Sequence, residues 1–141
     1  MIKVGIIGAN GFLGLELLRL LSIHLKVEIS KILKRENDIE EEFTHLSSLN
    51  LNDSQTSDIN DFKDLDCVFL SLPHGSANEY VSELIDKVKI IDLSSDYRID
   101  DNVSYEKYYK SSFDPKIQKK FNYGFIEKSI DEIQKAFNIS N

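Results

Sequence analysis

The chain has 141 residues, about the length of one domain, and 41% of them are hydrophobic, which is enough for a single core. Its 17 Lys and Arg against 24 Asp and Glu leave a net charge of -7, so the chain would repel a phosphate backbone and we expect no nucleic-acid partner. The single cysteine, Cys67, excludes an internal disulfide and a cysteine-based zinc cluster, and we expect a cytoplasmic protein without a metal.

An apolar stretch from Val4 to Leu21 has the length of a signal peptide or a membrane span. Asn10, Glu16 and Arg19 interrupt this stretch, and no small-residue cleavage site follows it. The stretch is therefore better explained as folded structure, and we expect no membrane partner.

Short apolar runs rich in β-branched residues predict parallel strands, and these are Ile2–Ile7, Val27–Leu33, Leu65–Leu72 and Lys89–Leu93. Segments with helical periodicity predict helices, and these are Phe12–Leu25, Ser76–Val88 and about Ile130–Phe137. Between Lys34 and Asp64 the chain turns acidic and polar, and we expect loops with short elements. Strands separated by helices predict an α/β fold, a Rossmann-like open, mostly parallel sheet with right-handed crossovers and helices on both faces.

The predicted helices differ in which of their side chains we expect to be buried. Leucines occupy most of the circumference of the Phe12–Leu25 helix, so we expect it to be largely buried. In the second helix the residues expected to face inward are Tyr80, Val81, Leu84 and Ile85. A capping box, Ser129 followed three residues later by Glu132, predicts the start of the last helix.

The sharpest motif is Gly8–Gly14, a G-x-x-G-x-x-G segment directly after a predicted strand and at the start of a predicted helix. Glycines there permit a positive φ, close approach of the backbone to a pyrophosphate and close helix packing, while the helix N-terminus offers N–H groups to phosphates. This placement favours dinucleotide binding over a glycine turn that only packs well. The candidate cofactor-binding residues are Gly8, Asn10, Gly11, Phe12, Leu13 and Gly14.

Lys34 and Arg35 follow the second predicted strand, where a site for NAD would place an acidic residue against the ribose 2′-hydroxyl. A guanidinium can bind a 2′-phosphate through two hydrogen bonds, so this pair predicts NADP as the cofactor. The alternative is a pair of solvated loop cations beside the acidic run Glu40–Glu42.

Polar residues also follow the third predicted strand, at the carboxyl edge where open α/β sheets bind ligands. A second cofactor contact is expected there from Leu72, Pro73, His74 and Gly75. His74 has no carboxylate partner nearby in the sequence, so we assign it no catalytic role. Cys67 lies within the same strand without an activating cation and is interpreted as a core residue.

The segment Asp92–Arg98 follows the fourth predicted strand and again places polar groups at a carboxyl edge. Arg98 can bind an anion through two hydrogen bonds, but it could equally pair with Asp96 or Asp100. Because the surroundings are not basic, we expect the nearby aromatic side chains to pack over a loop, and these are Tyr105, Tyr108 and Tyr109.

Together these motifs resemble the N-terminal, nucleotide-binding part of the N-acetyl-gamma-glutamyl-phosphate reductases, the acyl-phosphate reductases of arginine biosynthesis. The resemblance covers nearly the whole chain, and its most specific blocks are the proline-histidine-glycine run at 73–75 and the aspartate-leucine-serine run at 92–94. The further matching segments are 3–8, the glycines with 16–21, 45–46, Ile91, Asp96, Arg98, 105–107, 123–124 and Glu127.

The resemblance implies NADPH as hydride donor, an acyl phosphate as substrate and reduction to a semialdehyde through a cysteine thioester. It places Gly8–Gly14, Arg35 and Leu72–Gly75 at the cofactor, and Ser94 and Arg98 at the substrate or its phosphate. The full-length protein is expected to be a homo-oligomer.

The family's nucleophilic cysteine follows an asparagine-proline-glycine sequence that would begin at Asn141, and its acid/base histidine lies further along. We therefore expect residues 1–141 to be an NADP-binding domain truncated before the catalytic domain, with no catalytic residue and no reductase activity of its own. The strand-like run from Phe137 to Ser140 favours this hypothesis over a closed module.

Two alternatives remain open. One is a related reductase that acts on aspartyl phosphate or on a carrier-linked aminoadipyl phosphate. The other is a standalone NADP-binding or redox-sensing module without chemistry of its own.

Overall fold

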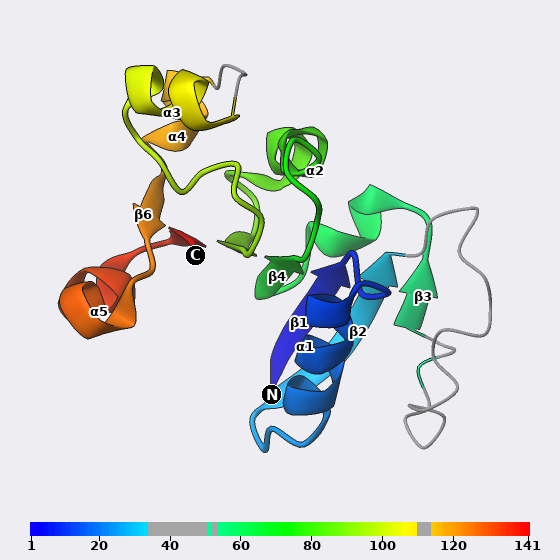
Figure 1. Ribbon diagram of the computed structural model, residues 1–141. Helices are drawn as coiled ribbons and strands as arrows, with labels where there is room; N and C mark the ends of the chain where they lie inside the picture. Colours follow the sequence, from blue (N-terminus) through cyan, green and yellow to red (C-terminus); the bar gives the residue numbers. More distant parts are fainter. Residues whose placement is uncertain (34–50, 52–53, 110–113) are drawn as a thin grey trace.

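The computed structural model describes residues 1–33, 51, 54–109 and 114–141 (Figure 1). Its strands are β1 (Ile2–Ile7), β2 (Val27–Leu33), β3 (Gln55–Thr56), β4 (Cys67–Leu70), β5 (Lys89–Asp92), β6 (Phe121–Tyr123) and β7 (Asn138–Ser140). Its helices are α1 (Phe12–Ser22), α2 (Ala77–Leu84), α3 (Asn102–Tyr109), α4 (Pro115–Gln118), α5 (Ile126–Lys135) and the short 3₁₀ helix η3 (Ile59–Phe62). None of the helices described here is long and apolar enough to cross a bilayer.

The described strands form one parallel sheet in the order β3-β2-β1-β4-β5-β7-β6. From β1 the chain first adds β2 and β3 on one side, and it then returns to add β4 and β5 on the other side. This reversal puts the carboxyl ends of β1 and β4 next to each other, and such a switch point is where open α/β sheets bind ligands. The Rossmann-like fold expected from the sequence is confirmed.

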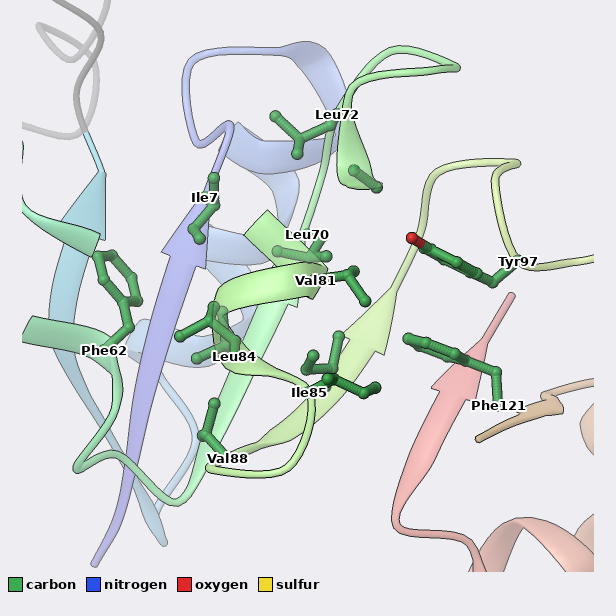
Figure 2. Packing of buried hydrophobic residues seen from close by; sticks show 13 residues of the cluster. Ile7, Phe62, Leu70, Leu72, Val81, Leu84, Ile85, Val88, Tyr97 and Phe121 are labelled. Carbon is green, nitrogen blue, oxygen red and sulfur yellow. The ribbon is translucent and has the colours of Figure 1, made fainter. Parts of the chain in front are cut away.

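Each face of the sheet carries its own core, so the prediction of helices on both faces is also confirmed. Under α1 the buried side chains are Val4, Ile6, Leu18, Ile32 and Cys67. Under α2, on the opposite face, they include Val68, Leu70, Val81, Leu84 and Ile90. Figure 2 shows Val81 and Leu84 of this second core near Leu70. The rings of Tyr97 and Phe121 stack with their centroids 4.5 Å apart.

Helix α1 departs from its prediction in length and in burial. It ends at Ser22 instead of Leu25, and only Gly14 and Leu18 are buried. Phe12 is 92% exposed and Leu20 is 48% exposed, so the expectation of a largely buried helix was wrong. One sheet face can cover only one side of a helix. Leu17 and Leu21 are partly buried against this core, whereas Leu13 and Leu20 lie on the exposed side.

Helix α5 also corrects its prediction. It runs from Ile126 to Lys135, and the predicted capping residue Ser129 lies inside it at a kink, with φ −135° and ψ 33°. The Ser129 hydroxyl donates backward to the Phe125 carbonyl oxygen at 2.9 Å. Ser129 thus separates two helical segments, and the second begins directly after it, near the predicted start at about Ile130. The hydrogen bonds that its hydroxyl donates run backward and do not cap this segment, which ends at Lys135 and not at Phe137.

No element was predicted from the sequence at α3, α4 or β6. Only Tyr105 of α3 is buried, so the helix lacks the apolar period that would have indicated it. Helix α4 has four residues and starts at Pro115. Asp114 is its N-cap, and the Asp114 side chain accepts a hydrogen bond from the Lys116 N–H. The expected packing is confirmed for Tyr105, which is buried, and for Tyr109, whose ring stacks on His74 of the loop after β4. It is wrong for Tyr108, which is 67% exposed.

Candidate functional site at the carboxyl edge of the sheet

The turn between β1 and α1, here called the glycine turn (residues 8–14), lies at the carboxyl end of the central strand. Gly8 has φ +83°, which the sequence predicted for this turn. A Cβ on Gly8 would come within 3.0 Å of the Ser71 carbonyl oxygen, and a Cβ on Gly14 would meet the Gly8 oxygen equally closely. At Gly11 the nearest atom to such a Cβ is 3.8 Å away, so this side of the turn is open.

The open side of the glycine turn faces the beginning of α1. Gly11 caps the helix in an extended conformation without a side-chain hydrogen bond, and the first turn of α1 carries no acidic residue. Neither a cap side chain nor a carboxylate therefore offsets the positive end of the helix dipole. These features suit the phosphates of a dinucleotide, which would lie against Gly11 and the first N–H groups of α1.

The loop Leu72–Gly75 follows β4 and lies beside the glycine turn. Leu72 is buried, whereas Pro73, His74 and Gly75 are exposed, and Gly75 has φ +84°. The Ser71 N–H donates to the Ile7 carbonyl oxygen at 2.8 Å, which joins the start of this loop to the end of β1. The structure thus brings together the two segments that the sequence assigned separately to the cofactor.

His74 has the carboxylate partner that its sequence neighbours lack. Its Nδ1 lies 2.7 Å from Asp96 Oδ1 and 2.9 Å from Ser95 Oγ, and its ring stacks on Tyr109 at 4.3 Å. Asp96 comes from the loop after β5, because the carboxyl ends of β4 and β5 are neighbours. The sequence does not indicate this contact, because Asp96 lies 22 positions after His74, and there Asp96 had only a possible pairing with Arg98 and a place in the family resemblance.

The loop after β5 holds a second buried carboxylate. Asp92 Oδ1 accepts from the Ser94 N–H at 3.0 Å and Oδ2 accepts from the Ser94 hydroxyl at 2.9 Å. Burial raises the pKa of Asp92 to about 6, although the hydrogen bonds from Ser94 act in the opposite direction. Ser94 is itself buried and accepts from the Asp96 N–H, so its hydroxyl supports the loop.

Arg98 lies at the end of this loop and is exposed. In the described part of the chain it donates to the carbonyl oxygens of Asn141 at 2.7 Å and Ser94 at 3.4 Å, and not to Asp96 or Asp100. It lines a cavity of about 240 Å³ together with Tyr97, Asp100, Gln118, Phe121 and Tyr123.

Two further predictions concern residues away from this edge. Cys67 is a buried core residue as predicted, and burial raises the pKa of its thiol to about 11. Lys34 and Arg35 lie outside the described residues. Within the described residues, no group of three or more His, Cys, Asp or Glu side chains could hold a metal ion.

The glycine turn at a switch point defines a dinucleotide-binding class of domain, and the family comparison agrees. Residues 3–135 match the family described as semialdehyde dehydrogenase, NAD binding domain, and the chain belongs to this family.

Relatives within the family carry two kinds of name. An N-acetyl-gamma-glutamyl-phosphate reductase of Herminiimonas arsenicoxydans is 37% identical to this chain over 146 residues. A protein of Pyrococcus abyssi named as a LysW-L-2-aminoadipate/LysW-L-glutamate phosphate reductase is 40% identical over 144 residues. Each alignment covers 100% of this chain but 42% of the relative, so the chain spans less than half the length of these proteins. The resemblance found in the sequence is confirmed.

Solved structures show the same fold. Aspartate semialdehyde dehydrogenase with NADP from Candida albicans superposes with a TM-score of 0.63 at 15% identity, over 100% of this chain and 43% of that one. Aspartate semialdehyde dehydrogenase II of Vibrio cholerae gives a TM-score of 0.61 at 17% identity, over 99% and 40%.

Proposed function

We propose that this chain is the NADP-binding part of an N-acetyl-gamma-glutamyl-phosphate reductase. The observation that carries the proposal is the glycine turn, whose open side at Gly11 faces an uncapped helix N-terminus within a semialdehyde dehydrogenase family domain. When bound, the dinucleotide would supply the hydride that reduces an acyl phosphate to a semialdehyde.

The residues of this chain divide into those that hold the cofactor and those that face the substrate. The proposed cofactor residues are Gly8, Asn10, Gly11, Phe12, Leu13, Gly14, Lys34, Arg35, Leu72, Pro73, His74 and Gly75. Arg98 is the proposed contact for the substrate phosphate, because it belongs to the loop after β5, lines a cavity and carries a guanidinium that can bind an anion through two hydrogen bonds. Ser94 belongs to the same region, and its hydrogen bonds indicate that it acts by supporting this loop.

A binding experiment tests the cofactor proposal. By calorimetry we expect NADP to bind more tightly than NAD, because Lys34 and Arg35 stand where an NAD site would place a carboxylate. Arg35→Ala should weaken NADP binding roughly ten- to a hundredfold and leave NAD nearly unchanged. The matched control is Arg19→Ala, which removes an exposed arginine paired with Glu16. Equal losses for both cofactors would remove Arg35 from the 2′-phosphate site.

We also propose that this chain has no reductase activity alone. Its single thiol, Cys67, is buried and has a raised pKa, so it cannot serve as the thiolate that attacks the acyl phosphate. Cys67→Ala should leave NADP affinity intact. Phosphate-dependent reduction of NADP by the 141 residues in the presence of a semialdehyde would contradict this part of the proposal.

The second candidate function is a reductase of carrier-linked aminoadipyl or glutamyl phosphate, which is favoured by the 40% identity to the Pyrococcus abyssi protein. Assay of a full-length protein carrying this domain separates the two. N-acetylglutamate semialdehyde supports the reverse reaction in the first case, and only the carrier-linked semialdehyde does so in the second. Light scattering on the same protein tests the expected homo-oligomer.

A further inference from the structure

Asp96 is a buried carboxylate that joins two loops at the carboxyl edge. Its side chain is 5% exposed. Oδ1 accepts from the Gly75 N–H at 2.6 Å, and Oδ2 accepts from the Ala77 N–H at 3.0 Å. His74 Nδ1 lies 2.7 Å from Oδ1, so one side chain contacts three consecutive features of the chain: the ring, the turn and the start of α2.

These contacts replace the cap that α2 does not supply for itself. The residue at its N-cap, Ser76, makes no side-chain capping hydrogen bond. The carboxylate that accepts from the first helical N–H, that of Ala77, comes instead from Asp96, 19 residues further along the chain. A negative charge at a helix N-terminus is favourable, and charged hydrogen bonds are stronger than neutral ones.

Leu72 packs into the core, but packing contributes little to the rest of the same loop, residues 73–75. A Cβ on Gly75 would have no atom within 4 Å, so neighbouring side chains do not confine this turn. Pro73 and His74 are exposed as well. This exposed part of the loop is therefore held by polar contacts and one aromatic stack. The Gly75 N–H donates to Asp96, and the Pro73 carbonyl oxygen accepts from the Ser76 N–H. The His74 ring contacts Asp96 and Ser95 and stacks on Tyr109.

The contact with Asp96 also decides which nitrogen of His74 carries a proton. Nδ1 faces two groups: the Asp96 carboxylate at 2.7 Å, which can only accept a hydrogen bond, and the Ser95 hydroxyl at 2.9 Å, which can donate or accept one. A proton on Nδ1 suits both neighbours, whereas an unprotonated Nδ1 would face the carboxylate oxygen with no proton between them. In the neutral ring Nε2 is then the acceptor. The stacking on Tyr109 fixes the plane of the ring, so both the tautomer and the orientation are set by the protein.

We infer that Asp96 is the positioning residue of the cofactor loop: it holds Leu72–Gly75 in place and keeps His74 as the Nδ1–H tautomer. Nε2 then accepts a hydrogen bond from a hydroxyl or amide N–H of the dinucleotide. This inference rests on the proposed function for its ligand, but its effect on the loop exists without a ligand.

Asp96→Asn tests the inference with a side chain of the same size. An amide has one acceptor oxygen, so it cannot accept from both Gly75 and Ala77. By ¹⁵N NMR without cofactor we expect at least about tenfold faster amide exchange at these two residues, and a gain of the Nε2–H form of His74. NADP affinity should fall about tenfold in calorimetry, while circular dichroism stays unchanged. Asp64→Asn, an exposed carboxylate before the amino end of β4, is the control and should change none of these.

Several results would overturn the inference. The first is a wild-type His74 in the Nε2–H form, which can be measured even when the variant does not fold. Unchanged exchange and tautomer in Asp96→Asn is the second, and an NADP affinity within twofold of wild type despite altered spectra is the third. Failure of the wild-type chain to bind NADP would contradict the proposed function instead, and the ligand-free spectra would still decide the role of Asp96.

Discussion

The glycine turn and the loops after β4 and β5 meet at one edge of the sheet, but different forces hold them. The glycine turn is fixed by close backbone contact, since a Cβ at Gly8 or Gly14 would collide with main-chain atoms. The other region, called here the carboxylate corner, consists of Leu72–Gly75 with Asp92, Ser94 and Asp96, and it is held by hydrogen bonds to buried carboxylates. Substitutions that add atoms should damage the first region, and changes in charge should damage the second.

The largest effect is expected from Gly8→Ala. The new side chain would have to adopt φ +83° and would lie within 3.0 Å of the Ser71 carbonyl oxygen, so strain and overpacking add. We expect the free energy of unfolding to fall by about 3 kcal/mol or more. Urea unfolding followed by circular dichroism measures this loss. A loss below about 1 kcal/mol would mean that backbone packing does not define the turn.

The carboxylate corner should show its character in the pH dependence of stability. Burial raises the pKa of Asp92 from 3.8 to about 6, so the folded protein binds a proton there more tightly than the unfolded chain does. The stabilisation from the protonated form is fully present below about pH 4 and is lost as the pH rises through about 6.

Asp92→Asn removes this titration. Between pH 4 and pH 7 the stability of the wild type should fall by about 2–3 kcal/mol relative to the variant, since one pKa unit corresponds to 1.36 kcal/mol. Unfolding in urea at several pH values measures the difference in free energy of unfolding between wild type and variant. Other titrating groups are common to both proteins, so their contributions cancel in this difference. A constant difference across this range would show that Asp92 does not titrate near pH 6.

A smaller effect is expected from Gly75→Ala, which also has to adopt a positive φ, +84°, but meets no atom within 4 Å. The cost is then conformational only, about 1–2 kcal/mol. Gly75→Asn is the matched control and should lose less, because asparagine tolerates the left-handed region better than alanine. If alanine here cost as much as at Gly8, the contrast between the two regions would not hold.

The same contrast explains what the sequence could predict. The glycine turn is local: strand, glycines and helix follow one another within a few residues. Their order predicted a turn whose glycines permit a positive φ, and in the structure Gly8 adopts it. The carboxylate corner depends on residues that are far apart in the chain and adjacent only because β4 and β5 pair. The sequence therefore indicated no carboxylate partner for His74, whereas the structure places Asp96 beside it.

Helix prediction failed for a related reason. The leucines of α1 indicated a helix correctly, but the sequence does not show how much of that helix the sheet covers. Helix α3 has only one buried residue, so no apolar period announced it. Apolar periodicity in the sequence predicted the helices and strands that pack regularly against the core. It missed the elements that are held by a few contacts with distant parts of the chain.

The smallest change in stability, and the most specific change in binding, is expected from Gly11→Ala. Gly11 has φ −76° and ψ 162°, which alanine adopts readily, and the nearest atom to a new Cβ would be 3.8 Å away. Alanine is a poorer N-cap than glycine but restricts the unfolded chain, so stability should stay within about 0.5 kcal/mol of wild type.

The added methyl group would nevertheless occupy the open side of the turn, where a pyrophosphate has to approach the backbone. We expect NADP affinity to fall at least about tenfold in calorimetry on the same fully folded sample. Unchanged affinity would place the cofactor elsewhere on the edge, whereas a loss of stability equal to that of Gly8→Ala would show that Gly11 also serves packing.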